Sequence, residues 1–468
     1  MGNFMSRKFQ TKVIPSTWLT HNGRRLDCGP YMSGAIEAIE LLKKLRTETL
    51  ETITDGIFHA GREGRQYVVD AEYGVPFMGS TDILAFDLSS QPLLSKRQVE
   101  KNPNFTIRKG WTLITRSGTT GRMAYGRKAM DGMACSEHVM RVVPNTNKVQ
   151  PGYLYAFLSS RFGIPIVVSG TYGSIIQSIE PHQVANLPVP RLGLVEGHAH
   201  QLVEESAQLL SLGQNQLNEA TNLFFSSVGL SDITQADWHS WGSDLGFSSN
   251  VDIRSLRALN YNQRFCRLVD MIKSTDWKSL EQICLPGSIK RGGRYNRIDA
   301  DPEHSYHMIG QKEIFWLRPE GRWIAKSCVD KEVLVEPGTI LIAGAGTFGE
   351  FELYCRSELI WGKAAERAYS ELFYRVIADE GEMLPGCLFA FMRSEIAFRM
   401  IRSISFGSKL QYPLISLLHE LPVPYPSRQV QDEINQLVIN AYESRDRAIE
   451  LEDQARTLVE QAIEKGGW

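Results

Sequence analysis

The chain repeats part of its own sequence, and this duplication constrains its fold more than any other feature. YGSIIQSIEPHQVANLPVP at residues 172–190 is answered by FGSKLQYPLISLLHELPVP at residues 406–424, with seven of nineteen positions identical at an offset of 234 residues. Three further pairs follow the same order in both halves: LITRSGTTG with LIAGAGTFG, SEHVMRVV with SELFYRVI, and PGYLYAFLSS with PGCLFAFMRS. A repeat of this length predicts two copies of one structural unit.

Each half carries the same kinds of predicted element. GWTLIT at residues 110–115 and GTILIA at residues 338–343 are apolar and β-branched, which predicts strands that end in glycine-rich turns. The Pro-Gly that opens PGYLYAFLSS is typical of a helix start. LPVP predicts an extended connector, because proline cannot continue a helix. Strands and helices therefore mix in each half, and the expected fold class is α+β.

A long polar stretch after each LPVP predicts a long helix. In the second stretch, alanine and leucine rows recur every seven residues, and the leucine row has a counterpart in the first stretch at the same offset. The predicted coiled-coil residues are Val203, Leu210, Leu217, Phe224, Ile434, Leu437, Ala441, Ala448, Leu451, Ala455 and Leu458. We expect the two helices to pack on each other; the alternative is that each packs only on its own domain. About 30 helical residues span roughly 45 Å, which equals about 13 base pairs of duplex.

Composition and local charge narrow the class of protein. The net charge is −2, and the seven cysteines are scattered without a C-x-x-C pair, which favours a reduced, cytoplasmic protein without a zinc site. No apolar run approaches the roughly 20 residues of a membrane span, so no membrane partner is expected. Residues 96–131 hold nine Lys or Arg against two acids, and residues 284–297 hold four and no acid. Such stretches predict contact with an anion; the alternative is a solvated surface.

Several short motifs occur in a fixed order and recur in the second half. In the first half they are Gly118-Thr119-Thr120-Gly121, Ser136-Glu137-His138, Pro151-Gly152-Tyr153-Leu154-Tyr155-Ala156-Phe157-Leu158, Tyr172-Gly173-Ser174 and Leu187-Pro188-Val189-Pro190. This order, duplicated and followed each time by a long helix, resembles the specificity subunits of type I restriction-modification systems. The second half departs from the pattern at Ala345 and Phe406.

The resemblance implies a fold and a role. It implies two tandem target recognition domains, separated by two long helices that form an antiparallel coiled coil with pseudo-two-fold symmetry. Each domain would read one half of a bipartite sequence in double-stranded DNA. Two adenine-N6 methyltransferase subunits and motor-nuclease restriction subunits would be the partners. S-adenosylmethionine, ATP and Mg would bind in those partners, and this chain would be non-catalytic and without a cofactor of its own.

The expected domain boundaries follow the repeat. They are residues 1–194 for the first target recognition domain, 195–228 for the first spacer helix, 229–426 for the second domain with a lead-in segment at 229–252, and 427–468 for the second helix.

DNA-reading residues should lie on loops near the basic stretches, because Arg and Lys bind guanine or phosphate and Gln and Asn suit adenine. In the first half the candidates are Arg116, Ser117, Thr119, Thr120, Arg122, Tyr125, Arg127, Lys128, Ser174 and Gln177. In the second half they are Lys290, Arg291, Arg294, Tyr295, Arg297, Thr347, Ser408, Lys409 and Gln411.

Two alternative functions stay open. Residues 344–349, GAGTFG, match the G-x-G-x-x-G dinucleotide fingerprint, which would indicate a nucleotide-dependent enzyme if a helix began at the last glycine. The following EFELYC looks like a strand, so we expect a hairpin turn instead. The second alternative is a DNA-recognition subunit of another phage-defence system with different partners.

Overall fold

The computed structural model divides into two compact units. It describes residues 11–21, 24, 26, 28–169, 178–242, 246–251 and 254–466. Unit 1 comprises Met1–Arg62, Pro103–Glu205 and Leu451–Trp468, and unit 2 comprises Glu63–Asn102 and Ser206–Glu450. Residues 63–102 of the first half thus cluster with the second half. The target recognition domain boundaries expected from the repeat stay a prediction, since compactness does not test which residues read DNA.

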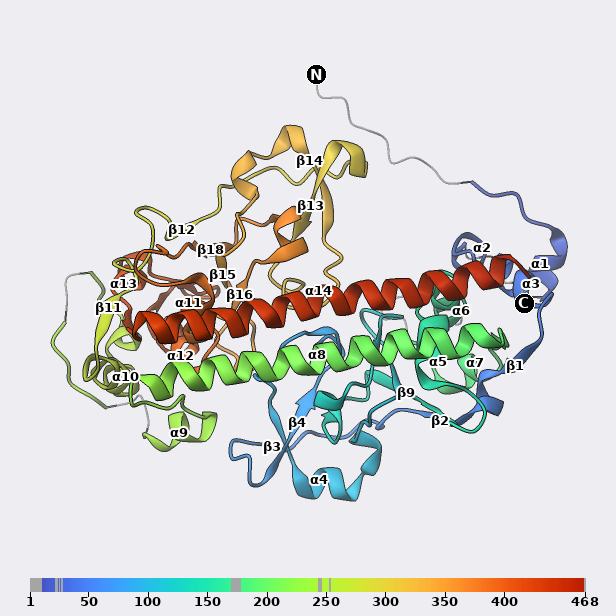
Figure 1. Cartoon of the computed structure of the whole chain (residues 1–468), viewed down its shortest axis with the longest axis horizontal. Coiled ribbons are helices and arrows are strands. Elements are labelled where there is room, and N and C mark those ends of the chain that lie inside the picture. The colour runs from blue at the N-terminus through green and yellow to red at the C-terminus, as the bar shows by residue number, and fades with distance from the viewer. Residues whose placement is uncertain are drawn as a thin grey trace. The chain divides into compact units, whose positions relative to one another are not determined.

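Unit 1 is built around a four-stranded antiparallel sheet (Figure 1). Its order is β2 (Thr54–Phe58), β9 (Val139–Pro144), β6 (Thr112–Thr115) and β7 (Met123–Tyr125). A second, two-stranded ladder pairs β1 (Thr47–Thr49) with β10 (Pro188–Pro190). The remaining elements are α1 (Ser16–His21), α2 (Gly29–Met32), α3 (Ala35–Leu42), β8 (Ala134–Cys135), α5 (Pro151–Leu158), α6 (Gly163–Ser169) and α7 (Pro181–Ala185).

Unit 2 repeats both ladders. Its four-stranded sheet has the order β12 (Lys290–Arg291), β18 (Phe373–Val376), β15 (Ile340–Ala343) and β16 (Ser357–Leu359). β11 (Trp277–Ser279) pairs with β21 (Pro422–Pro424), and Val423 lies opposite Lys278 just as Val189 lies opposite Glu48 in unit 1. The second LPVP is therefore a short strand in the same register as the first. The predicted internal repeat and the α+β fold class are confirmed.

Unit 2 holds further helices and strands outside these two ladders. The helices are α4 (Lys96–Lys101), α9 (Gln235–Ser240), α10 (Gln263–Lys273), α11 (Pro385–Met392), α12 (Glu395–Ser403) and α13 (Ile415–His419). The strands are β3 (Tyr67–Val68), β4 (Gly74–Met78), β5 (Leu93–Ser95), β13 (Ser305–Ile309), β14 (Arg322–Ala325), β17 (Ala368–Tyr369), β19 (Ser405–Phe406) and β20 (Tyr412–Pro413). α11, the Pro-Gly helix of the second half, is counterpart to α5.

Two long helices, α8 (Leu194–Ser227) and α14 (Arg428–Glu464), each have one end in unit 1 and the other in unit 2. Within unit 2 they are antiparallel neighbours (Figure 1): a Cβ on Gly213 would lie 3.0 Å from the Ala441 carbonyl, and Ser226 shares a groove with Glu433. The close approach needs small residues on both sides. Such residues recur every seven positions on α8, and all of them are buried: Ala199, Ser206, Gly213 and Ala220.

Nine of the eleven residues predicted for the seam are buried, whereas Leu437 and Leu458 are half-buried; that these residues form a coiled-coil seam stays a prediction. The second buried row of α14 instead follows the alanine row by four positions. Its members are Val438, Arg445, Glu452 and Val459. α14 packs on the globular part of unit 2 as well as on α8, because the Asn435 side chain accepts a hydrogen bond from the Gly386 N–H at 2.8 Å. The buried stripe is therefore wider than a two-helix seam requires.

The segment from residues 63–102 is fixed to the rest of unit 2 by three kinds of contact. Ala85 forms an antiparallel bridge with Trp316. The Phe86 ring packs edge-on against Tyr442 with centroids 5.9 Å apart. Asp87 makes an ion pair with Arg393 at 2.6 Å. None of the helices in the described part of the chain has the length and apolar composition to cross a membrane.

Candidate nucleic-acid interface

The tip of the β15–β16 hairpin in unit 2 lies beside the loop that joins β19 to β20. Gly346 and Gln411 exchange two backbone hydrogen bonds, with N···O distances of 3.2 and 2.8 Å. The two loops carry four of the candidate residues, and they lie together although the chain separates them by some 60 residues. These are Thr347, Ser408, Lys409 and Gln411.

The hairpin tip is held from its inner side by two buried or half-buried side chains. Gln311 binds the backbone of Ala345 twice, with its amide donating at 2.9 Å and its carbonyl accepting at 3.0 Å. The Arg402 guanidinium donates to the carbonyls of Thr347 and Gly349 at 3.2 and 2.8 Å. Because the backbone is fixed from behind, the side chains of the tip point outward, and Thr347 is exposed.

Positive charge flanks the tip. Lys409 is exposed and makes no ion pair with the residues that the structure describes. Arg257 donates from Nη1 to the Gly407 carbonyl at 2.9 Å, and its guanidinium carbon lies 5.6 Å from the Phe348 ring centroid. Arg291 approaches from β12 and stacks over the Tyr412 ring at 4.9 Å.

Two of the candidates near the tip differ in accessibility. Ser408 is exposed, whereas Gln411 is only 4% exposed and its amide donates to the Ser408 carbonyl at 2.6 Å. In this arrangement Gln411 supports the loop, and a direct base contact by its side chain would require the loop to open.

The basic run KRGGRYNR continues from β12 along the surface of unit 2. Arg294 is exposed, whereas Arg297 is bound to Glu371 at 2.9 Å and Lys290 lies 3.7 Å from Glu332. Tyr295 is half-buried, and burial together with the nearby carboxylate of Glu371 raises its pKa to about 12. The carboxylates of Glu332 and Glu371 weaken the positive field of this run, so it is a less favourable phosphate site than the tip.

The equivalent tip in unit 1 has a different inner support. Arg116 is buried, and its guanidinium donates to the Ile179 carbonyl at 2.9 Å and pairs with Glu180. Ser117 binds the ring of His138, and Thr119 and Thr120 are half-buried. The guanidinium of Arg116 is thus engaged within the protein, and the hydroxyl oxygen of Thr119 is buried.

Four further candidates follow this tip in unit 1. Tyr125 is buried and donates to Glu204 on α8 at 2.5 Å, and burial raises its pKa. Arg127 is 2% exposed, Arg122 is half-buried, and Lys128 is exposed. Ser174 and Gln177 lie outside the described residues. That any candidate in either unit contacts DNA stays a prediction; what the structure gives is which side chains are accessible.

Three residues of the unit 2 interface were not among the sequence candidates: Arg257, Gln311 and Arg402. Arg257 lies in a segment with only a weak echo in the first half, and Gln311 lies in MIGQKEI, which weakly matches FMGSTDI. No pattern in the sequence connects them to residues 344–349. Their role depends on contacts between segments far apart in the chain.

Residues 344–349 form a hairpin turn, as expected from the strand-like sequence that follows. β16 pairs antiparallel with β15, and no helix begins at Gly349. A Cβ on Gly344 would lie 2.6 Å from the Leu372 carbonyl, so glycine is required there by close packing. The fingerprint therefore has a structural explanation. The described residues also contain no group of His, Cys, Asp or Glu suited to hold a metal ion.

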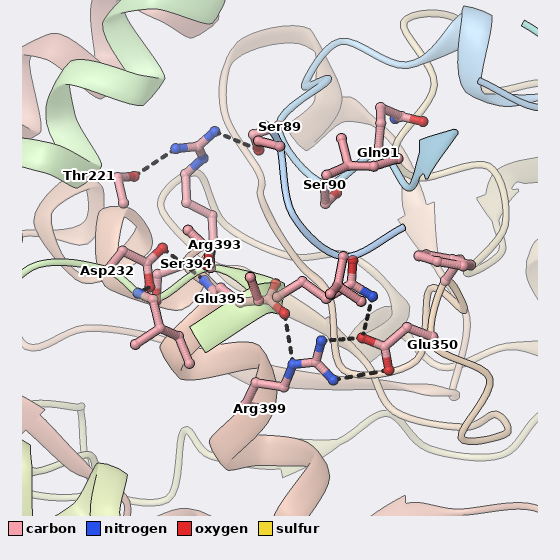
Figure 2. Close-up of a pocket in the computed structure, with 18 of the residues that line it drawn as sticks. Ser89, Ser90, Gln91, Thr221, Asp232, Glu350, Arg393, Ser394, Glu395 and Arg399 are labelled. Atoms are coloured by element: carbon pink, nitrogen blue, oxygen red, sulfur yellow. Dashed lines mark hydrogen bonds and ion pairs between the residues drawn. The ribbon is translucent and has the colours of Figure 1, made fainter. Parts of the chain in front are cut away.

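A cavity of 530 Å³ in unit 2 lies between residues 69–93 and the start of α12 (Figure 2). Arg399 pairs with Glu395 at 2.7 Å and with Glu350, whose pKa burial would raise but the Arg399 charge lowers to about 2. Asp232 accepts backbone hydrogen bonds from Glu395 and Ile396 at the helix start, and burial raises its pKa to about 6. Arg399, Glu350 and Asp232 are thus all engaged by other groups of the protein at the wall of this cavity.

Comparison with known proteins adds a distant similarity. No family model matches the chain, and no curated protein is a significant match. The chain is similar to the S subunit of a type I restriction-modification system from M. genitalium, with 13% identity, a TM-score of 0.35 and coverage of 90% of this chain and 96% of that one. The HsdS subunit from Thermoanaerobacter tengcongensis is 12% identical with a TM-score of 0.27 and the same coverage of each chain. A chain from a type I R-M system, solved for its complex assembly and conformational transition, is also 12% identical with a TM-score of 0.27, over 89% of this chain and 97% of that one.

Proposed function

We propose that the chain is the DNA-specificity subunit of a type I restriction-modification system, and that it recognises a bipartite target without catalysing a reaction. The observation that supports this most is the duplicated sheet. Both units carry the same strand order and a hairpin tip at the same place in the sheet, but the two tips carry different side chains and are supported by different residues. Two copies of one scaffold with different tips are suited to read two different half-sites.

The two long helices support a spacer role. α8 has 34 residues and is therefore about 51 Å long. Both helices have one end in unit 1 and the other end in unit 2. In this proposal the helices set the spacing of the half-sites and bind two adenine-N6 methyltransferase subunits. Motor-nuclease subunits join for restriction. S-adenosylmethionine, ATP and Mg are bound by these partners, and the complex acts in the cytoplasm.

The first test is a map of N6-methyladenine in the host genome, with and without this gene and with its methyltransferase present. We expect one bipartite motif with a fixed spacer to lose its methylation when the gene is deleted. Restoring the gene with Arg257→Ala and Lys409→Ala together should restore little methylation, because both groups flank the unit 2 tip. Arg322→Ala is the matched control, since Arg322 is an exposed arginine of unit 2 that pairs with Asp299. An unchanged methylation pattern on deletion would contradict the proposal.

A recognition subunit of another phage-defence system would share the scaffold and differ in its partners. Co-purification of the full chain from its host separates the two. A methyltransferase among the bound proteins supports the proposal, and a complex without one favours the alternative.

A further inference from the structure

Phe348 is a large apolar side chain that unit 2 leaves 39% exposed at the tip of the β15–β16 hairpin. Exposing an aromatic ring is unfavourable, by roughly 25 cal/mol for each Å² of apolar area. The position is not forced by the fold, because the same tip in unit 1 carries Thr120, at the offset of 228 that relates the two glycine-rich turns. An exposed ring at this position therefore suggests a contact made outside the chain.

The ring is held in a defined orientation. It packs edge-on against Tyr354, with centroids 6.0 Å apart and an interplanar angle of 69°. The guanidinium of Arg257 lies 5.6 Å and that of Arg402 5.9 Å from its centroid. With Gln311 and Arg402 also fixing the backbone, the tip is ordered before it meets any ligand, which lowers the entropic cost of binding.

The groups around the ring suit a nucleic acid. Lys409 is exposed beside the tip, and Arg257 uses only Nη1 in a hydrogen bond to the described protein, at Gly407. The exposed Lys409 and the half-buried Arg257 are therefore two cations near the tip that suit contact with phosphate. An apolar side chain near such cations is suited to contact the 5-methyl group of thymine, which lies in the major groove and which both Phe and Thr side chains contact.

We infer that Phe348 is a specificity-determining residue that reads a thymine 5-methyl group in the second half-site, while Thr120 occupies the same place in unit 1. This inference rests on the proposed function. It adds which side chain reads the base and by what chemistry. It also explains why the two tips carry different side chains, Phe348 and Thr120, at the same position.

The experiment pairs a change in the protein with a change in the DNA. The full chain, bound to its methyltransferase subunits, is titrated with a duplex carrying the mapped target and with duplexes in which each thymine of the second half-site is replaced by deoxyuridine. Loss of one methyl contact should weaken binding by the wild type about fourfold at one thymine. Phe348→Ala should weaken binding of the full target about tenfold or more and should abolish the difference between thymine and deoxyuridine at that position. Phe348→Leu should restore part of the difference.

Matched controls separate the possible failures. Phe351→Ala removes an equally exposed ring from the same hairpin, one that packs against Tyr67 at 5.2 Å, and should leave the thymine preference intact. If Phe348→Ala weakens target and non-target duplexes equally, or if no deoxyuridine substitution affects the wild type, the inference is wrong although the proposed function stands. If the wild type shows no preference for the mapped target, the proposed function fails and the inference with it.

Discussion

The Asp87–Arg393 pair fixes residues 63–102 to unit 2, and its removal should destabilise that unit strongly. Arg393 is only 5% exposed at its side chain, and both Nε and Nη2 donate to the same carboxylate oxygen of Asp87, at 2.9 and 2.6 Å. Nη1 binds the Leu217 carbonyl at 2.9 Å and the Thr221 hydroxyl at 2.6 Å on α8, and Nη2 also reaches Ser89 (Figure 2). Asp87→Ala leaves this buried charge without its counter-ion.

The size of the effect follows from the burial of the pair. Breaking a buried ion pair by removing one partner costs ~3–5 kcal/mol, and the retained hydrogen bonds from Arg393 place the expected loss near the lower end, at about 3 kcal/mol. Burial alone would raise the pKa of Asp87, but the Arg393 charge and the hydrogen bonds from Gln214 and Ser89 lower it to about 2. Lowering the pKa of Asp87 by about two units corresponds to roughly 2–3 kcal/mol of stabilisation. This value is close to the loss of about 3 kcal/mol expected for Asp87→Ala.

The sign of the pH dependence gives an independent check. Because the folded pKa is depressed, the stabilisation is complete above about pH 4 and is lost as the pH falls toward 2. The difference in unfolding free energy between the wild type and Asp87→Asn should therefore shrink over that window. Urea unfolding of the full chain, followed by far-UV circular dichroism, measures the unfolding free energy of each protein at each pH.

An exposed pair of the same chemistry in unit 2 is the control. Arg322 binds Asp299 in a bidentate manner at 2.8 Å, but the two side chains are 54% and 65% exposed. Asp299→Ala should cost under about 1 kcal/mol. Equal losses for Asp87→Ala and Asp299→Ala would refute the reasoning that burial, and not distance, sets the strength of these pairs.

Two further predictions concern the long helices. Gly213→Ala should lower the thermal stability measured by calorimetry, because its Cβ would lie 2.9 Å from the Phe86 ring and 3.0 Å from the Ala441 carbonyl. Gly197→Ala has open space around its Cβ and should raise the free energy of unfolding by up to about 1 kcal/mol. Burial raises the pKa of Glu358 to about 7 against the opposing effects of Arg445 and Tyr442. In urea titrations, the wild type should therefore lose stability relative to Glu358→Gln as the pH rises from about 4.5 to 7. If the difference in unfolding free energy between the two proteins stays constant over this range, Glu358 is ionised in the folded protein.

The repeat was predictable because identical residues recur in the same order, at an offset of 234 residues or, for the glycine-rich turns, 228. LPVP could be recognised as extended from the chemistry of proline, and the alanine row of α14 from its spacing. Leu437 and Leu458 show where spacing is insufficient: a heptad does not reveal that α14 also packs on other elements, which shifts its second buried row to Val438 and Val459. The association of residues 63–102 with unit 2 depends on pairs such as Asp87 and Arg393, which no local pattern connects.

The interface was only partly predictable, because sequence gives the charge of a side chain and not its partner. Arg116 lies in a basic stretch, yet it is buried and paired with Glu180. Lys409 is exposed and Arg257 is half-buried at the unit 2 tip, but only Lys409 lies near a recognisable motif. Phe348 could not be predicted as a site residue, because the sequence does not show whether an apolar residue in a turn is exposed or buried.

The buried charges described above also affect how such a protein would find its target. Among the described residues, seven arginines but only four glutamates and no aspartate are buried. The solvent-facing surface is therefore more negative than the net charge of −2 implies. Non-specific affinity for DNA comes from exposed cations that displace counterions, so burying seven arginines should help the chain to leave random sequences quickly. Rapid release from the many competing sites of a genome would shorten the search, with recognition left to a few accessible residues at the two tips.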